Sequence, residues 1–280
     1  MKKSFWLIIV FSWFCILVFP QNNSVNIKVD VKIKGTSLNH IWSYCVGAGR
    51  ANEGLRISWI EHLALAREQC GFQYVRFHGL FHDDMFVYKE INGNPYYNFQ
   101  YIDDVFDRML AMNVRPFVEL GLFPEAISAK ETCFWWGGHG APPDDFTKWI
   151  KLVEAFIHHC INRYGIEEVQ KWYFEVWNEP NLSGFWGGTM QQYFDMYKLT
   201  VLAIKSINPT LRTGGPATSS YHPEEGVYDS LKALYPFSPE VFRNIQCKGP
   251  WIEEFIEFCR SRKPASRFYF FSSISYYLPS

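Results

Sequence analysis

The sequence has no excess of basic residues and few cysteines. Lys and Arg total 27 against 28 Asp and Glu, so the formal net charge is −1, and the basic surplus that nucleic-acid binding requires is absent. The 7 cysteines among 280 residues include no Cys-x-x-Cys pair, and a chain of this length can bury a core without a disulfide framework. Nucleic-acid-binding proteins and small disulfide-stapled folds are therefore excluded, and nucleic acid is not an expected partner.

Aromatic residues are the unusual part of the composition. Hydrophobic residues make up 48% of the chain and charged residues 20%, the balance of a folded globular protein rather than a disordered one. Aromatic side chains reach 19%, with 11 Trp. Trp and Tyr present flat apolar surfaces with one polar group, which suits the C–H face of a sugar ring. The composition is a first indication of a carbohydrate ligand.

The first twenty residues form a segment of their own. Lys2 and Lys3 precede an apolar run at 5–19, and Pro20 follows it. A short, positively flanked run is typical of a secretory signal peptide, with an uncleaved membrane anchor as the alternative. We therefore expect a secreted or periplasmic location. Cys15 lies in this segment; we expect the other cysteines to be buried thiols, although export would also permit disulfides.

The rest of the chain is patterned as an α/β protein. Residues 25–34 alternate apolar and polar side chains and predict a half-exposed strand. Beyond it, short apolar runs alternate with amphipathic stretches, the pattern of a parallel sheet with connecting helices. The predicted strands are 42–47, 74–78, 114–120, 172–178, 211–214 and 268–274, and the predicted helices are 58–70, 99–112, 144–164, 191–207 and 251–261.

These elements form five β/α units and part of a sixth. They predict an incomplete (β/α)8 TIM barrel of about five and a half units. A long, proline-containing segment near 218–250 interrupts the repeat and is predicted to be an insertion. The expected organisation is a leader at 1–20, a segment at 21–40 with the first strand, and the partial barrel at 41–280.

One strand ends in a motif that carries chemistry. Asn178-Glu179-Pro180 closes the fourth predicted barrel strand, and Pro180 prevents further sheet hydrogen bonding. Glu179 therefore lies at the carboxyl end of a strand, where barrel enzymes build their active sites. Glu175, Trp177 and Glu179 share one parity and are expected on one side of the strand. Two acids on one side of a buried strand indicate a polar, functional interior.

The sequence around Glu179 resembles the active-site motif of glycoside hydrolase family 39, the β-xylosidase and α-L-iduronidase family of clan A, and is closer to the β-xylosidase branch. The resemblance covers roughly residues 42–259. The segments that carry it are Trp172-Tyr-Phe-Glu-Val-Trp-Asn-Glu-Pro-Asn-Leu-Ser-Gly-Phe-Trp186, Cys45-Val-Gly-Ala-Gly-Arg50, Tyr74-Val-Arg-Phe-His-Gly-Leu80, Arg115-Pro-Phe-Val-Glu-Leu-Gly121 and Gly214-Gly-Pro-Ala217.

The resemblance implies roles for single residues. It implies a (β/α)8 barrel with an accessory β-sandwich, to which the strand at 25–34 would contribute. Glu179 takes the position of the catalytic general acid/base, and Asn178 that of the residue that holds the sugar 2-hydroxyl. Arg76 matches the second-strand arginine that supports the nucleophile, and His78 a histidine of the sugar pocket. The implied partner is a carbohydrate, xylosides or xylo-oligosaccharides, with no cofactor; a homo-oligomer of the full-length form stays open.

The chemistry explains these residue types. Retaining glycosidases use two carboxyl groups about 5 to 5.5 Å apart, one that protonates the leaving oxygen and one that attacks the anomeric carbon. Glu179 must therefore hold a proton, which a neighbouring carboxylate and an apolar wall such as Trp177 would favour by raising its pKa. Asn178 would hydrogen-bond the 2-hydroxyl more strongly in the transition state than in the ground state.

Three further candidates have two readings each. The segment from His78 to Asp84 contains metal-ligand residue types, but its spacing matches no zinc motif, so we expect no metal site. The resemblance implies instead that His78 contacts the substrate. Trp136, in an aromatic loop after the third strand, is either a sugar platform or part of the loop packing. Glu119 is either a partner in an interior ion pair or a substrate contact.

The carboxyl-terminal part departs from the family pattern. The family's nucleophile is a Glu at the end of the seventh strand, and we expect these 280 residues to reach only the sixth. The stretch 265–277 also lacks the Asp and His of the family's sixth strand, and we hypothesise a slipped reading frame near Pro264 and a truncated chain. Two functions follow: an exported retaining glycosidase acting on β-xylosides or related glycosides, inactive without its nucleophile, or a non-catalytic, sugar-binding relic.

Overall fold

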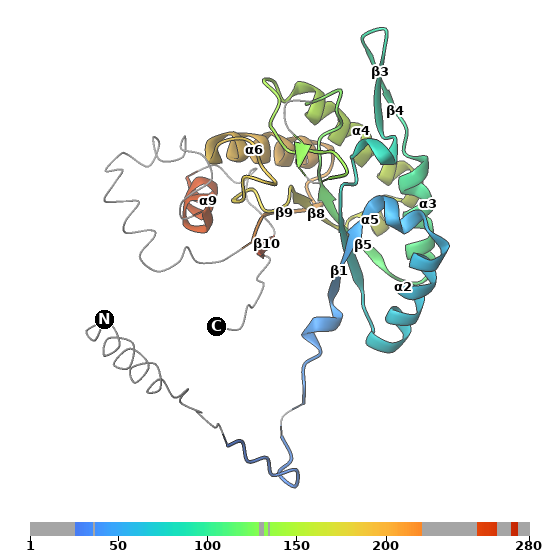
Figure 1. Cartoon of the computed structure of the whole chain (residues 1–280), viewed down its shortest axis with the longest axis vertical. Coiled ribbons are helices and arrows are strands. Elements are labelled where there is room, and N and C mark those ends of the chain that lie inside the picture. Colours follow the sequence, from blue (N-terminus) through green and yellow to red (C-terminus); the bar gives the residue numbers. More distant parts are fainter. Residues whose placement is uncertain are drawn as a thin grey trace, which may run out of the picture. The chain divides into compact units, whose positions relative to one another are not determined.

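The computed structural model describes residues 26–35, 37–128, 132–133, 135–219, 251–261 and 270–273 (Figure 1). The chain divides into a unit up to Asn39 and a unit from His40 onward, which contains the described helices and strands. Within these ranges, no helix combines the length and the hydropathy needed to cross a membrane. The predicted leader at 1–20 and residues 220–250 of the predicted insertion lie outside the described residues.

Six strands form one parallel sheet whose order in space follows their order in the chain. The strands are β1 (Cys45–Arg50), β2 (Tyr74–His78), β5 (Arg115–Leu120), β8 (Tyr173–Val176), β9 (Arg212–Thr218) and β10 (Phe270–Ser273). Each strand pairs in parallel with the next, as successive units of a TIM barrel do. The predicted α/β class and the parallel sheet are confirmed. The strand order is that of part of a TIM barrel.

Helices connect the strands and return the chain to the same edge of the sheet. They are α2 (Ile57–Cys70), α3 (Gln100–Ala111), α4 (Thr147–Tyr164), α5 (Ile166–Val169), α6 (Met190–Ile207) and α9 (Trp251–Arg260). Figure 1 shows α2 and α3 beside the β1–β5 part of the sheet and α6 beside β8 and β9. Because the strands are parallel, their carboxyl ends meet at one edge of the sheet, and side chains that follow different strands can share a site there.

Helix α4 shows how the sequence pattern positions an element near that edge. Its buried residues follow the spacing of one helix face. They are Trp149, Leu152, Val153, Phe156, Ile157 and Cys160. The Trp149 ring lies 5.7 Å from the Phe81 ring and 6.4 Å from the Trp177 ring. The buried face of α4 therefore supports the loops that follow β2 and β8.

Most predicted bounds agree with the structure to within a few residues, and the range 74–78 coincides with β2. The first strand begins later than predicted because Ile41–Ser43 form a 3-10 turn, and β9 extends to Thr218. The pattern of apolar residues does not predict the antiparallel hairpin of β3 (Tyr88–Ile91) and β4 (Asn94–Tyr97). Its turn, Asn92-Gly93, has φ values of 52° and 77°, and Asn-Gly is the dipeptide that favours such a turn.

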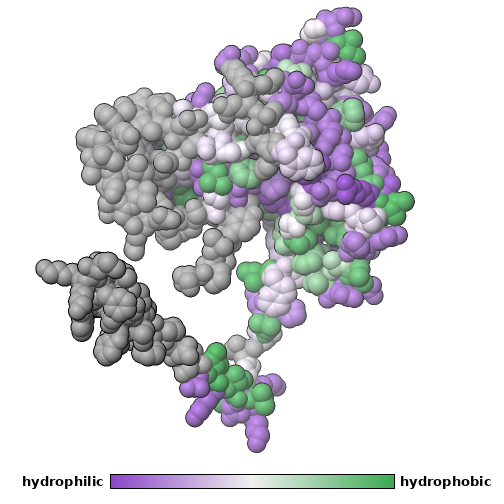
Figure 2. Space-filling view, viewed as in Figure 1, coloured by the Kyte–Doolittle hydropathy of each residue, from purple (hydrophilic) through white to green (hydrophobic). Residues whose placement is uncertain are grey.

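Residues 26–35 are irregular, so the predicted strand at 25–34 is wrong for the residues described there. Ile27, Val29, Val31 and Ile33 are 80%, 77%, 89% and 72% exposed, and Figure 2 shows this segment as a mixture of hydrophobic and hydrophilic surface. A strand depends on a paired neighbour, and no strand among the described residues pairs with this segment. The alternation of apolar and polar residues is therefore not enough to form a strand here. The accessory β-sandwich is not confirmed.

Four of the cysteines lie in the described side chains, and all four are free thiols. Cys160 and Cys259 are buried, as predicted. Cys45 is half-buried, and Cys70 at the end of α2 is exposed, which contradicts the prediction. Cys70 is the last residue of α2, a helix in which Leu63 is the only buried residue.

Candidate active site

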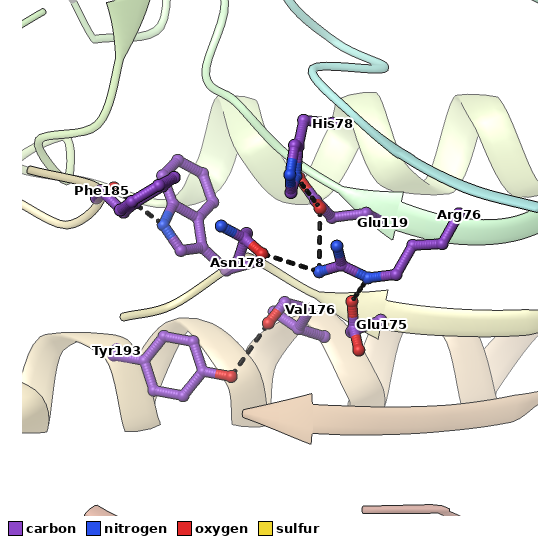
Figure 3. A network of polar contacts seen from close by, with 9 residues as sticks. Arg76, His78, Glu119, Glu175, Val176, Asn178, Phe185 and Tyr193 are labelled. Carbon is purple, nitrogen blue, oxygen red and sulfur yellow. Dashed lines mark hydrogen bonds and ion pairs between the residues drawn. The ribbon is translucent and has the colours of Figure 1, made fainter. Parts of the chain in front are cut away.

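Arg76 on β2 is the centre of a buried polar network (Figure 3). Its Nε donates to Oε2 of Glu175 at 2.6 Å, and its Nη2 donates to Oδ1 of Asn178 at 2.9 Å. The same Nη2 lies 2.9 Å from Oε2 of Glu119. The Arg76 side chain is 13% exposed and both carboxylates are 1% exposed. One guanidinium thus joins side chains from three adjacent strands and the loop after β8.

The register of the sheet explains why a cation lies at this point. Glu119 and Glu175 are register partners on β5 and β8, so two acidic side chains lie side by side in the interior. Buried carboxylates of the same charge destabilise one another unless a cation compensates them. Burial by itself would lower the pKa of Arg76, but Glu175 and Glu119 outweigh it and raise the pKa. Arg76 therefore stays charged and holds the two acids together.

Glu119 also forms an ion pair with His78. Nδ1 of His78 lies 2.6 Å from Oε2 of Glu119. The Glu119 charge raises the pKa of His78 above its ordinary value, against the opposing effect of burial. Burial would raise the pKa of Glu119, but His78 and Arg76 lower it overall. Of the two roles considered for Glu119, the structure shows that of a partner in an interior ion pair. The same pair favours the protonated form of His78.

We expect His78 to titrate above the ordinary histidine pKa of about 6.5, and Glu119→Gln to lower that pKa because the facing charge is lost. Since folding raises the pKa, protonated His78 stabilises the folded chain fully below about pH 6.5, and this contribution is lost as the pH rises through the folded-state pKa.

An NMR titration of the His78 ring, assigned with His78→Gln, measures the pKa. Urea unfolding of the chain and of His78→Gln, below and above that pKa, measures the stability. A difference in unfolding free energy that is the same at both pH values would contradict the expectation.

Glu179 is buried beside this network, in the loop that follows β8. Its amide donates to the carbonyl oxygen of Ala217 on β9 at 2.9 Å, and the residue is 4% exposed. Burial raises the pKa of Glu179, and the charge of Glu119 adds to this, while His78 and Arg76 oppose it. The outcome is a carboxyl group that keeps its proton more readily than an ordinary glutamate.

Trp177 does not lie on the strand face predicted for it. Strand β8 ends at Val176, and Trp177 and Glu179 have φ values of 71° and 43°, so the alternation of an extended strand does not continue. The Trp177 ring lies 4.5 Å from the Phe123 ring, and its N–H donates to the carbonyl oxygen of Phe185 at 3.0 Å. Trp177 therefore belongs to an aromatic core, and the shared-parity argument is wrong although the acids do gather in one interior.

Asn178 has an oriented side-chain amide with a donor left over. Its Oδ1 accepts from Arg76 at 2.9 Å, which fixes the orientation of the group. Its Nδ2 is buried and has no hydrogen-bond partner among the described residues. A buried donor without an acceptor is costly, and a hydroxyl group of a bound ligand would satisfy it.

Trp136 lies in a neighbouring cluster rather than in the Arg76 network. The Arg50 guanidinium lies 4.4 Å above its ring, and the His82 ring meets it edge-on at 4.9 Å. Arg50 and His82 both pair with Asp84, at 2.7 Å and 2.8 Å. One face of the Trp136 ring is thus covered by the Arg50 guanidinium. The sequence pattern does not predict the cluster of Arg50, His82, Asp84 and Trp136. Its one signal in the sequence is a charged residue, Arg50, at the end of strand β1.

The structure brings Arg76, His78, Asn178 and Glu179 together. Within the described part of the chain, no group of three or more His, Cys, Asp or Glu side chains could hold a metal ion. A carboxyl group with a raised pKa, an oriented amide and two basic side chains are groups that can bind hydroxyl groups and transfer a proton to a leaving oxygen.

Comparisons with known proteins identify the family of this chain. A family model described as Glycosyl hydrolases family 39 matches residues 25–233. A β-xylosidase from Geobacillus stearothermophilus is 42% identical over 228 residues, which cover 79% of this chain and 40% of that protein. A β-xylosidase from Caldicellulosiruptor saccharolyticus is 43% identical over 185 residues, 65% of this chain and 38% of that protein.

A solved structure agrees as well. The crystal structure of the GH39 enzyme from Xanthomonas axonopodis pv. citri aligns with a TM-score of 0.71 and 34% identity, over 85% of this chain and 42% of that one. The chain thus spans about 40% of the length of the curated β-xylosidases it matches. The family match covers three quarters of the chain, including every member of the Arg76 network, and the chain belongs to glycosyl hydrolases family 39, a family of glycosidases.

Proposed function

We propose that these residues form the acid/base part of the active site of an exported retaining glycosidase that acts on β-xylosides or related glycosides. The observation that carries the proposal is the buried Glu179 carboxyl group with its raised pKa, next to the unpaired Nδ2 of Asn178. The matched β-xylosidases support the substrate class. Export rests on Lys2, Lys3 and the apolar run that follows them.

The proposed reaction has two proton-transfer steps at Glu179. In the first, Glu179 gives its proton to the leaving oxygen while a second carboxylate attacks the anomeric carbon from the opposite face of the sugar. In the second, the Glu179 carboxylate takes a proton from water, whose oxygen displaces the enzyme carboxylate. Asn178 Nδ2 holds a sugar hydroxyl, and Arg76 fixes the Asn178 amide. His78 donates to the sugar.

The nucleophile is proposed to lie outside the described residues. Of the buried carboxylates near Glu179, Glu175 and Glu119 both pair with Arg76, and Glu119 pairs with His78 as well. Both are thus committed to cations within the network. The resemblance to the family places the nucleophile on a seventh strand.

We expect the 280 residues alone to show no turnover of an aryl β-xyloside, because Glu119 and Glu175 are paired with cations among the described residues and cooperating catalytic groups act as a unit. A chimera in which residues 42–219 replace the matching part of the Geobacillus stearothermophilus β-xylosidase supplies the remaining strands. We expect this chimera to hydrolyse the same substrate.

Turnover by the purified chain alone that disappears in Glu179→Gln would show that the nucleophile lies within these 280 residues. A folded chimera that binds xylose without hydrolysing it would favour the second candidate function, a sugar-binding relic. That candidate is supported by the pairing of Glu119 and Glu175 with Arg76, which leaves Glu179 as the reactive carboxyl group of the network.

A further inference from the structure

A concave site lies beside the carboxyl ends of β1 and β2. A hollow of about 750 Å³ opens between the 3-10 turns that follow β1 (Ala51–Leu55) and β2 (Asp83–Met85) and the first turns of α3. Residues that line it include Asn52, Asp84, Phe86, Gln100, Tyr101 and Asp104. Two of its walls follow carboxyl ends of β1 and β2, and Glu179 follows the carboxyl end of the parallel strand β8. The hollow and the candidate active site therefore open at the same edge of the sheet.

Two aromatic rings of this hollow are exposed. Phe86 is 64% exposed and Tyr101 42% exposed, and their rings meet edge-to-face at 5.7 Å and 89°. Phe86 has a φ of 53°, a left-handed conformation that is strained for an aromatic residue. Burial of the ring does not compensate this strain, and strained residues of this kind cluster at ligand-binding sites. The two rings offer apolar faces to a ligand.

The two acidic side chains of the hollow are paired with cations, while Arg56 also lines the hollow and is exposed. Asp84 pairs with Arg50 at 2.7 Å and with His82 at 2.8 Å, so its charge is compensated. Asp104 pairs with Arg108 at 2.8 Å. The side-chain amide of Asn52 donates to the carbonyl oxygen of Asp84 at 3.2 Å. Aromatic faces beside amide groups and paired acids suit a hydroxyl-rich ligand, and the hydrogen-bond donors of Arg56 can also bind hydroxyl groups.

The hollow is connected to the loop that carries Trp136. Arg50 pairs with Asp84 in the wall of the hollow and at the same time lies 4.4 Å above the Trp136 ring. Because the hollow and the candidate active site open at the same edge of the sheet, one extended ligand could contact both without crossing the sheet.

We propose that this hollow is an accessory binding site for a neutral oligosaccharide, in which Phe86 and Tyr101 contact sugar rings remote from the bond that is cleaved. The choice of ligand rests on the proposed glycosidase function. The site itself consists entirely of residues between Asn52 and Asp104, so its binding can be measured on the 280-residue chain.

The test is isothermal titration calorimetry with xylohexaose. We expect the chain to bind it, and Phe86→Asn combined with Tyr101→Ala to weaken binding by about tenfold or more, since two ring contacts are lost. Asn replaces Phe86 because it tolerates a positive φ. Tyr96→Ala is the matched control, because Tyr96 is 57% exposed on the β3–β4 hairpin and does not line the hollow; its affinity should equal that of the unchanged chain.

A second measurement does not depend on the variants. Side-chain amide signals of Asn52 and Gln100 should shift in NMR spectra of the unchanged chain when xylohexaose is added. Unshifted amides, or a double variant that binds as tightly as the unchanged chain, would overturn the proposal. Equal binding of cellohexaose would support a site for neutral glycans in general.

The experiments can refute the accessory site and the proposed glycosidase function independently of each other. In the chimera, the double variant should lower kcat/KM for xylohexaose and leave hydrolysis of an aryl β-xyloside unchanged, because the small substrate does not reach the hollow. Binding that persists in a chimera without hydrolysis would refute the glycosidase and keep the accessory site. Equal loss on both substrates would refute the accessory site.

Discussion

Glu179→Gln in the chimera is expected to lower turnover of unactivated xylosides by about 10²- to 10⁴-fold, the range that a general acid contributes. The amide cannot donate a carboxylic proton, so the leaving oxygen departs as an unprotonated anion. An aryl xyloside whose leaving group is already stable as an anion needs little protonation, and its first step should be much less affected. The ratio of the two losses therefore reports the acid role directly.

The base role of Glu179 gives a second readout. Water attacks the glycosyl-enzyme poorly when no base takes its proton, whereas azide is a nucleophile that needs no base. Added azide should therefore restore part of the turnover of the activated substrate in Glu179→Gln. Glu61→Gln, on the exposed side of α2, is the matched control and should behave like the unchanged chimera. Equal losses on both substrates without azide rescue would remove Glu179 from the acid/base role.

Arg76→Met is expected to lower the free energy of unfolding of the chain by about 3–5 kcal/mol, the cost of leaving buried charges without their partner. Glu119 and Glu175 are both 1% exposed and would lose the guanidinium that lies between them. Protonation of these carboxyl groups would relieve part of the cost. The loss should therefore be larger at neutral pH than at acidic pH, as measured by urea unfolding at each pH.

The control for this experiment is Arg163→Met. Arg163 pairs with Asp107, and both side chains are exposed, at 41% and 45%; its second contact, with Asp103, is longer at 3.6 Å. Exposed pairs contribute less than about 1 kcal/mol, so this variant should unfold nearly as the unchanged chain does. An Arg76→Met variant within about 1 kcal/mol of the unchanged chain would show that the buried network does not stabilise the fold.

Local pattern carries much of the predicted fold. The range of β2 and the buried face of α4 follow from residue spacing along the chain, because burial on one face imposes a period. The placement of Glu179 at a strand end follows from Pro180, which cannot continue a ladder. The Asn92-Gly93 turn between β3 and β4 is also a local signal, although the pattern of apolar residues does not reveal it.

Contacts with distant parts of the chain decide two features that the local sequence pattern predicts wrongly. The segment 26–35 has the alternation of a strand but no paired neighbour among the described residues, and it is irregular. The apolar face of α2 buries only Leu63, which leaves Cys70 exposed. Strand formation at 26–35 and burial along α2 both depend on residues elsewhere in the chain. The spacing of a segment's own residues does not specify those contacts.

The sequence by itself determined which residues could carry the chemistry: Glu179 with Asn178 beside it, and basic side chains at Arg76 and His78. Only the tertiary structure decided how they act together. The register of β5 and β8 sets Glu119 beside Glu175, and that juxtaposition gives Arg76 its position. Positive φ values at Trp177 and Glu179 turn the two side chains away from strand alternation. These contacts join residues far apart in the chain, so no local period encodes them.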